Sequence, residues 1–153
     1  MAEARALAAQ AGPAVAFYKI GLELVMTGGL DLARELVRDG KQVFLDMKLL
    51  DIGNTVERAT RSAAAIGVTF LTVHAHDSKT LRAAVAGKTG TPLKILGVTV
   101  LTNLGADDLR EQGQPDAVQA LVARRAKLAP PTPACDGVVA SGLEAAAGSV
   151  TSL

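Results

Sequence analysis

The stretch "QVFLDMKLLDIGNT" (residues 42–55) places charged side chains inside an apolar, strand-like run. Side chains alternate between the two faces of a strand, so Val43 and Leu45 share one face while Asp46 and Lys48 share the other. Burying such charges under helices would cost several kcal/mol. A barrel avoids this cost because the second face points inward, with its charges near the carboxyl ends of the strands, where barrel active sites lie. The stretch therefore favours a barrel over a doubly wound sheet.

The rest of the chain alternates between strand and helix patterns, which is typical of parallel strands joined by crossover helices. Gly40 and Gly67 are expected to end two of the helices. Asn54 is the expected N-cap of the helix after residue 49, with Glu57 completing a capping box. A last helix is expected to begin at Leu143. Helices are expected at residues 2–11, 28–39, 54–67, 78–87 and about 106–128, and strands at 14–22, 42–49, 69–75, 93–102 and 136–141.

Composition bounds the class of protein. The chain has 153 residues, enough for one domain with a core, and a net charge of +1 that predicts no nucleic-acid partner. No apolar run reaches the roughly 18 residues of a membrane span, and the N-terminal residues lack the hydrophobic core of a signal peptide. Cys135 is the single cysteine, so no intramolecular disulfide can form. We expect a cytoplasmic protein without a membrane partner.

Three charged residues form the candidate site. Asp46 and Lys48 alone could be a structural ion pair, and Asp51 a solvated acid in a loop. Their place at the end of an apolar strand argues for a site, because the next loop brings Asp51 close enough to flank the lysine. His74 and His76 have an i, i+2 spacing that a metal could use, but no acid or cysteine cluster supports it. We expect no metal, and a hydrogen-bonded role for His74 inside the barrel.

The motif "DMKLLDIGNT" (46–55) resembles the D-x-K-x-x-D-I-x-N-T signature of the orotidine 5'-phosphate decarboxylase family. The stretches "FYKIGLEL", "TVHAH", "GVTVLT" and "DGVVAS" are similar to that family's second, fourth, fifth and sixth barrel strands. The resemblance covers residues 2 to 147. It implies an α/β TIM (β/α)8 barrel fold, present here as about five β/α units corresponding to strands 2 to 6. Residues 1–153 would form a single partial domain lacking the first and the last two strands.

The resemblance also implies the activity: conversion of orotidine 5'-phosphate to UMP and CO2 in pyrimidine biosynthesis, without a cofactor. Lys48 would be the proton donor, and the flanking carboxylates of Asp46 and Asp51 favour its charged form. Asp51 and Thr55 would reach into the neighbouring subunit's site, which implies a homodimer. Asn103 stands where the family usually has serine. The residues implied to bind substrate are Lys19, Asp46, Lys48, Asp51, Ile52, Thr55, Thr102 and Asn103.

Two other functions stay open. The sugar-phosphate relatives 3-keto-L-gulonate 6-phosphate decarboxylase and hexulose 6-phosphate synthase share the D-x-K-x-x-D strand but use magnesium. A non-catalytic remnant is the second alternative. The loops after the last two barrel strands, which carry the family's phosphate-binding arginine, have no counterpart in the chain. We therefore expect a truncated form with little activity by itself.

Overall fold

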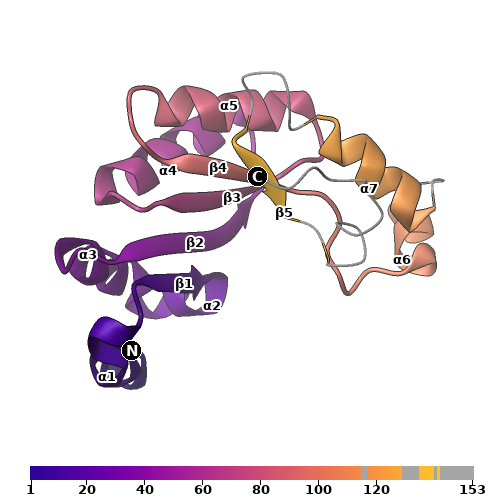
Figure 1. Cartoon of the computed structure of the whole chain (residues 1–153). Helices are drawn as coiled ribbons and strands as arrows, with labels where there is room; N and C mark the ends of the chain where they lie inside the picture. Colours follow the sequence, from indigo (N-terminus) through magenta and orange to yellow (C-terminus); the bar gives the residue numbers. More distant parts are fainter. Residues whose placement is uncertain (115–116, 129–134, 140, 142–153) are drawn as a thin grey trace.

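The computed structural model describes residues 1–114, 117–128, 135–139 and 141. Its centre is one sheet of five parallel strands in the order β1-β2-β3-β4-β5 (Figure 1). Each strand thus pairs with the next along the chain, as in a barrel wall. The strands are β1 (Phe17–Gly21), β2 (Gln42–Leu49), β3 (Phe70–His74), β4 (Lys94–Val98) and β5 (Gly137–Val139).

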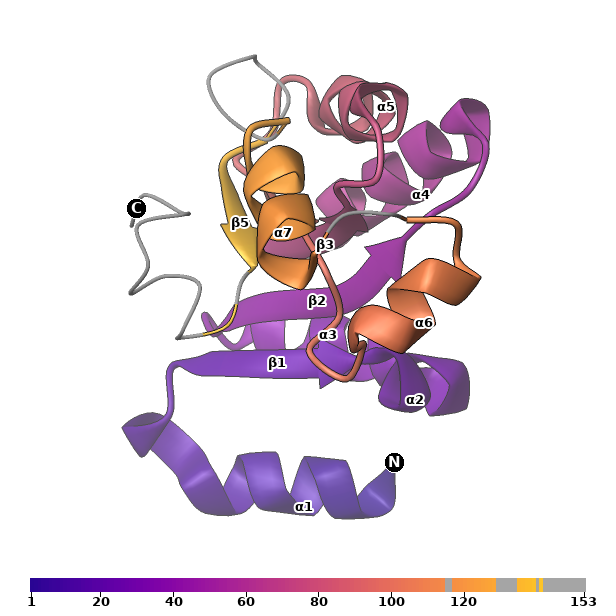
Figure 2. The ribbon, with the colours of Figure 1, turned by 90° about the vertical axis from the view of Figure 1, so that its right-hand side faces the viewer.

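The helices follow the expected alternation with the strands. Helix α1 lies at one end of the molecule beside β1, and α5 lies at the other end (Figures 1 and 2). None of the helices in the described residues is long and apolar enough to cross a membrane. The helices are α1 (Ala2–Ala11), α2 (Leu22–Leu24), α3 (Leu30–Arg38), α4 (Gly53–Ile66), α5 (Ser78–Lys88), α6 (Ala106–Glu111) and α7 (Val118–Ala126), with short 3-10 and π turns at Gly12–Ala14 and Val25–Gly29.

The predicted faces of β2 are confirmed. Val43 and Leu45 are buried in the main apolar core, together with residues of α3, α4 and α5. Asp46 and Lys48 are only partly buried and stand on the other face. The bounds of β2 also coincide with the predicted residues 42–49. The apolar side chains thus bind the sheet to its helices and leave the charged face for the site.

The start of α4 differs from the prediction. The N-cap position is Ile52, and no side chain caps the helix there, so the capping box at Asn54 and Glu57 is wrong. The N–H groups of Thr55 and Val56 already donate to the carbonyl of Ile52, which places Asn54 inside the first turn. The end is as predicted, because Gly67 has φ 87° and closes the helix in the left-handed conformation.

The predicted helix over 106–128 is two helices. Gly113 has φ 70°, and the N–H groups of Gly113 and Gln114 bond back to the carbonyls of Arg110 and Leu109. These bonds end α6, and α7 begins at Val118. Figure 1 shows α6 and α7 set apart from α3, α4 and α5. They pack around a second, smaller core, which comprises Val100, Leu109, Leu121 and Val122.

This second core also explains why β4 ends at Val98, short of the predicted residue 102. Val100 leaves the sheet to join α6 and α7, and the buried guanidinium of Arg125 donates to the carbonyl of Thr99 at 2.7 Å. Strand β1 is likewise shorter than the predicted 14–22. The helix expected from Leu143 lies outside the described residues.

Candidate active site

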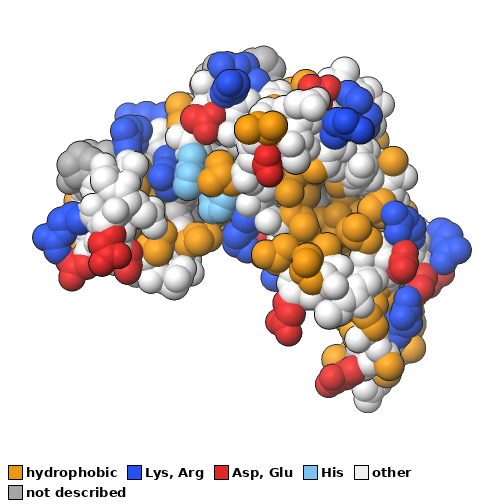
Figure 3. Space-filling model, turned by 180° about the vertical axis from the view of Figure 1, so that it is seen from behind, with side chains coloured by type: hydrophobic (Ala, Val, Ile, Leu, Met, Phe, Trp, Pro, Cys, Tyr) orange, Lys and Arg blue, Asp and Glu red, His pale blue; other side chains and the backbone are white. Residues whose placement is uncertain are grey.

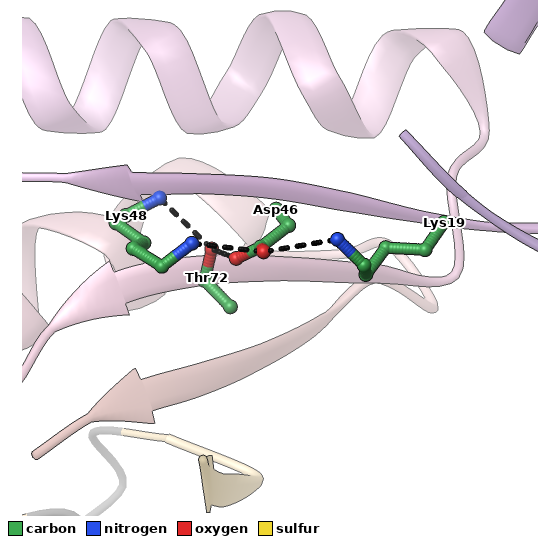
Figure 4. A network of polar contacts seen from close by, with 4 residues as sticks. All are labelled: Lys19, Asp46, Lys48 and Thr72. Atoms are coloured by element: carbon green, nitrogen blue, oxygen red, sulfur yellow. Dashed lines mark hydrogen bonds and ion pairs between the residues drawn. The ribbon is translucent and has the colours of Figure 1, made fainter. Parts of the chain in front are cut away.

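Four side chains from three neighbouring strands meet in one polar network (Figure 4). Lys19 lies on β1, Asp46 and Lys48 on β2, and Thr72 on β3. The Lys48 Nζ is 2.8 Å from Asp46 Oδ2, and the Lys19 Nζ is 3.4 Å from the same oxygen. The hydroxyl of Thr72 donates to the other oxygen, Asp46 Oδ1, at 3.0 Å. One carboxylate is therefore held by two ammonium groups and one hydroxyl.

Asp46 is the most enclosed charge of this network. Its side chain is 16% exposed, against 37% for Lys48 and 56% for Lys19. Burial by itself raises the pKa of Asp46. The hydrogen bonds from Lys48 and Thr72 and the charges of both lysines lower this pKa by more than burial raises it, so the net pKa lies below the ordinary value. The carboxylate is ionised at neutral pH, and its lysine partners remain open on the side that faces solvent.

The backbone at Lys48 is irregular. Its φ is 49°, the one positive value at a non-glycine residue in the described part of the chain. The register between β2 and β3 also shifts here: Leu45 pairs with Leu71, whereas Leu49 pairs with Val73. Two extra residues of β2 are accommodated here, an irregularity similar to a β-bulge, a feature that re-aims side chains and is frequent beside active sites. The Lys48 ammonium at this position contacts Asp46, two residues earlier on the same strand.

The loop after β2 and the first turn of α4 carry three predicted site residues, and none of them joins the network within one chain. Asp51, Ile52 and Thr55 are exposed. One carboxylate oxygen of Asp51 accepts the N–H of Ile52 at 2.7 Å, and the described residues give Asp51 no ion-pair partner. The Ile52 side chain is 72% exposed. The placement of Asp51 beside a lysine stays a prediction that requires a second copy of the chain.

The other two predicted residues lie in the turn after β4. Thr102 and Asn103 are exposed between Leu101 and Leu104, whose backbone groups close the turn at 3.0 Å. Neither side chain bonds to the network among the described residues. Their contact with a substrate stays a prediction.

His74 and His76, the two histidines, lie beside lysine and arginine side chains (Figure 3). Their ring centroids are 4.7 Å apart. Burial, with the neighbouring charges of His76, Arg125 and Lys48, lowers the pKa of His74 to about 4, and burial and Arg125 also lower the pKa of His76. The Nδ1 of His74 is buried without a partner in the described residues, so the predicted hydrogen bond is absent at this atom.

The low pKa of His74 predicts a pH dependence of stability. The unfolded chain binds a proton near pH 6.5, whereas the folded chain keeps His74 neutral until about pH 4. Stability should therefore be full above pH 6.5 and fall as the pH drops toward 4, by about 1–2 kcal/mol for this half-buried group. Denaturant unfolding at about pH 7 and about pH 4.5 measures the loss. The His74→Asn variant should lose less stability between these two pH values, because it lacks the contribution of His74. An equal loss in the variant and the parent would contradict the role of His74 in this pH dependence.

Within the described residues, no three His, Cys, Asp or Glu side chains come together as a group that could hold a metal ion. The candidate site is thus built from an acid, two lysines and a hydroxyl. Such an array can stabilise developing negative charge and supply a proton.

Comparison with known proteins gives the family. A family model described as "Orotidine 5'-phosphate decarboxylase / HUMPS family" matches residues 1–152. The chain belongs to this family. The motif of residues 46–55 that resembles the orotidine 5'-phosphate decarboxylase signature therefore lies within a match that extends over almost the whole chain.

Curated relatives carry the same name. An orotidine 5'-phosphate decarboxylase from a Bradyrhizobium species is 55% identical over 126 residues, which are 82% of this chain and 51% of the relative. The protein of that name from Methylorubrum extorquens is 53% identical over 144 residues, which are 94% of this chain and 61% of the relative. The chain thus spans about half the length of the curated relatives it matches.

Solved structures support the fold. The orotidine 5'-phosphate decarboxylase from Lactobacillus acidophilus matches with a TM-score of 0.76 at 36% identity, over 82% of this chain and 59% of that one. An uncharacterized conserved protein from Geobacillus kaustophilus matches with a TM-score of 0.82 at 34% identity, over 94% of this chain and 69% of that one. The predicted fold class, part of a TIM barrel, is confirmed.

Sequence reasoning missed Thr72 as a member of the polar network. The signal was present in "FLTVHA", where the alternation of β3 puts Thr72 and His74 on the face opposite buried Leu71 and Val73. The pairing of β2 with β3 then sets that face beside Asp46. A polar residue on the inward face of the strand next to a charged motif was therefore the clue.

Proposed function

We propose that the protein to which this chain belongs converts orotidine 5'-phosphate to UMP and CO2 without a cofactor. The observation that carries this proposal is the ionised Asp46, held at 2.8 Å by Lys48 and next to Lys19, in a chain of this family. The names of the relatives add support, since those that match at 53–55% identity are orotidine 5'-phosphate decarboxylases. The setting is cytoplasmic pyrimidine biosynthesis.

The proposed chemistry follows from the charge array. The bond between C6 of the pyrimidine and its carboxylate breaks, CO2 leaves, and the electron pair stays on C6. The Lys48 ammonium lies next to C6, stabilises this charge, and gives its proton to form the C6–H bond of UMP. Asp46 faces the substrate carboxylate, so their repulsion is relieved as CO2 forms. Lys48 then regains a proton from water.

The remaining proposed roles concern binding. Lys19 holds Asp46 and a ribose hydroxyl, and Thr102 and Asn103 contact the pyrimidine. In a homodimer, Asp51 and Thr55 of one subunit complete the site of the other, next to the exposed Ile52. A charge brought by a second copy would flank Lys48 on the side that a single chain leaves open. The chain then forms a single partial barrel domain over residues 1–153.

The test is UMP formation from orotidine 5'-phosphate, with and without EDTA. It uses the chain alone and a completed barrel, in which this chain's residues replace the matched segment of the Methylorubrum extorquens relative. The completed barrel should form UMP at a rate that EDTA does not change, and the chain alone should show little activity. A magnesium-dependent reaction on a sugar phosphate would favour the sugar-phosphate decarboxylases and synthases instead. No turnover at all would favour a non-catalytic remnant.

A further inference from the structure

We infer that Thr72 is a positioning residue that sets the geometry of both Asp46 and Lys48 through one hydroxyl group. The inference rests on the proposed function for its catalytic consequence, although its geometric part can be measured on the chain itself. Thr72 lies in the middle of β3, and none of its side chain is exposed. It does not reach solvent, so its effect on a substrate would pass through its neighbours.

The first role of the hydroxyl is to support the irregularity in β2. Four steps along β2, from Leu45 to Leu49, face two steps along β3, from Leu71 to Val73. Within this extra length, the N–H of Lys48 donates to the side chain of the neighbouring strand, at Thr72 Oγ1, over 2.8 Å. The left-handed conformation is disfavoured for a residue with a Cβ, so it needs support from its surroundings. Thr72 supplies this support from the facing strand.

The second role is to orient the carboxylate. A hydroxyl has one hydrogen and two lone pairs. Since Thr72 Oγ1 accepts the N–H of Lys48, its own hydrogen is free to donate to Asp46 Oδ1 at 3.0 Å. This leaves Oδ2 for the two ammonium groups of Lys48 and Lys19. The plane of the carboxylate is thus fixed by donors on both oxygens (Figure 4).

The combination requires a short side chain that both donates and accepts. Valine has the shape of threonine but neither capacity, and serine keeps both while losing a methyl group. Thr60 provides a matched control, because it is equally buried in α4 and its Oγ1 has no partner within the described residues. Replacing Thr60 by valine removes a hydroxyl from the interior without touching the network.

The first measurement uses the 153-residue chain and follows the Asp46 carboxyl by carbon NMR during a pH titration. Thr72→Val removes a hydrogen bond that lowers the pKa of Asp46, so this pKa should rise. Thr72→Ser and Thr60→Val should leave it where it is in the parent. If the valine variant does not fold, Thr72→Ala makes the same comparison.

The second measurement uses kinetics in the completed barrel. A displaced reacting group can cost on the order of 10²-fold, so Thr72→Val should lower kcat by about 10- to 100-fold while KM changes less than about threefold. Thr72→Ser should restore kcat to within about threefold of the parent, and Thr60→Val should match the parent.

The outcomes separate this inference from the proposed function. An unchanged pKa of Asp46 in Thr72→Val would overturn the inference, and so would serine and valine variants that lose kcat equally. If no form of the barrel releases CO2, the proposed function fails. A raised pKa of Asp46 in Thr72→Val alone would then still establish the positioning role.

Discussion

Replacing Lys48 by alanine in the completed barrel is expected to lower kcat for UMP formation by about 10⁴-fold or more. Under the proposed mechanism the variant loses its proton donor, an effect of about 10²–10⁴, and the positive charge beside the reacting carbon, an effect of about 10²–10³. The ammonium is aimed by its 2.8 Å contact with Asp46, so a free lysine elsewhere cannot replace it. Initial rates of UMP formation at saturating substrate measure the loss.

Lys94→Ala is the matched control. Lys94 is the first residue of β4, at the amino-terminal end of the parallel strands, whereas Lys48 lies near the carboxyl end of β2. The Lys94 ammonium lies 5.8 Å from the centroid of the Phe70 ring. Removing it changes the net charge equally but should leave kcat within about twofold. If Lys48→Ala kept more than about a hundredth of the parent activity, Lys48 would not be the proton donor.

The same variant examines the shared site. In a homodimer with Asp51 reaching across, a mixture of Lys48→Ala and Asp51→Ala chains forms hybrid dimers in which one site is intact. Random pairing of equal amounts should restore about a quarter of the parent's activity, while each variant alone stays inactive. No recovery after joint refolding would place Asp51 outside the neighbouring site.

The strand pattern around the motif was readable from the sequence because it depends on local alternation. The bounds of β2 and the opposite faces of Leu45 and Asp46 follow from the period of two. The ion pair of Asp46 with Lys48 follows too, since both side chains share a face. These features require no knowledge of what packs beside the strand.

The irregularity at Lys48 could not be read in this way. Its positive φ is set by how β2 pairs with β3, which is a tertiary feature, and the hydroxyl that supports it comes from Thr72, 24 residues later. Propensity alone does not place a lysine in the left-handed region. The position of Asp51 likewise depends on its surroundings rather than on its spacing from Lys48.

The break between α6 and α7 was readable and was missed. Gly113 lies inside the predicted helix over 106–128, and glycine is a frequent residue at the end of a helix. Its φ of 70° shows that it serves this purpose here. One helix is expected across this range from the sequence, although this single residue decides the local backbone.

The packing of α4 against α5 behind the site gives the last large expected effect. Gly87 lies in α5 and is buried against α4. A Cβ at this position would lie 2.8 Å from the Cβ of Thr60 and would overlap the carbonyl oxygen of Glu57. Because that oxygen belongs to the backbone of a helix, it cannot turn aside as a side chain could. Gly87→Ala should therefore destabilise the fold by about 2–4 kcal/mol.

Helix propensity predicts the opposite sign, which makes the result decisive. Alanine inside a helix is favoured over glycine by about 1 kcal/mol, so without the close contact Gly87→Ala would stabilise the protein. Gly53→Ala, at the first residue of α4, is the control, since its Cβ would meet the Cβ of Ala83 at an ordinary 3.7 Å. It should change stability by less than about 1 kcal/mol. Denaturant unfolding of both variants compares the two effects directly. If the Gly87→Ala chain were as stable as the Gly53→Ala chain, α4 and α5 would not pack at this separation.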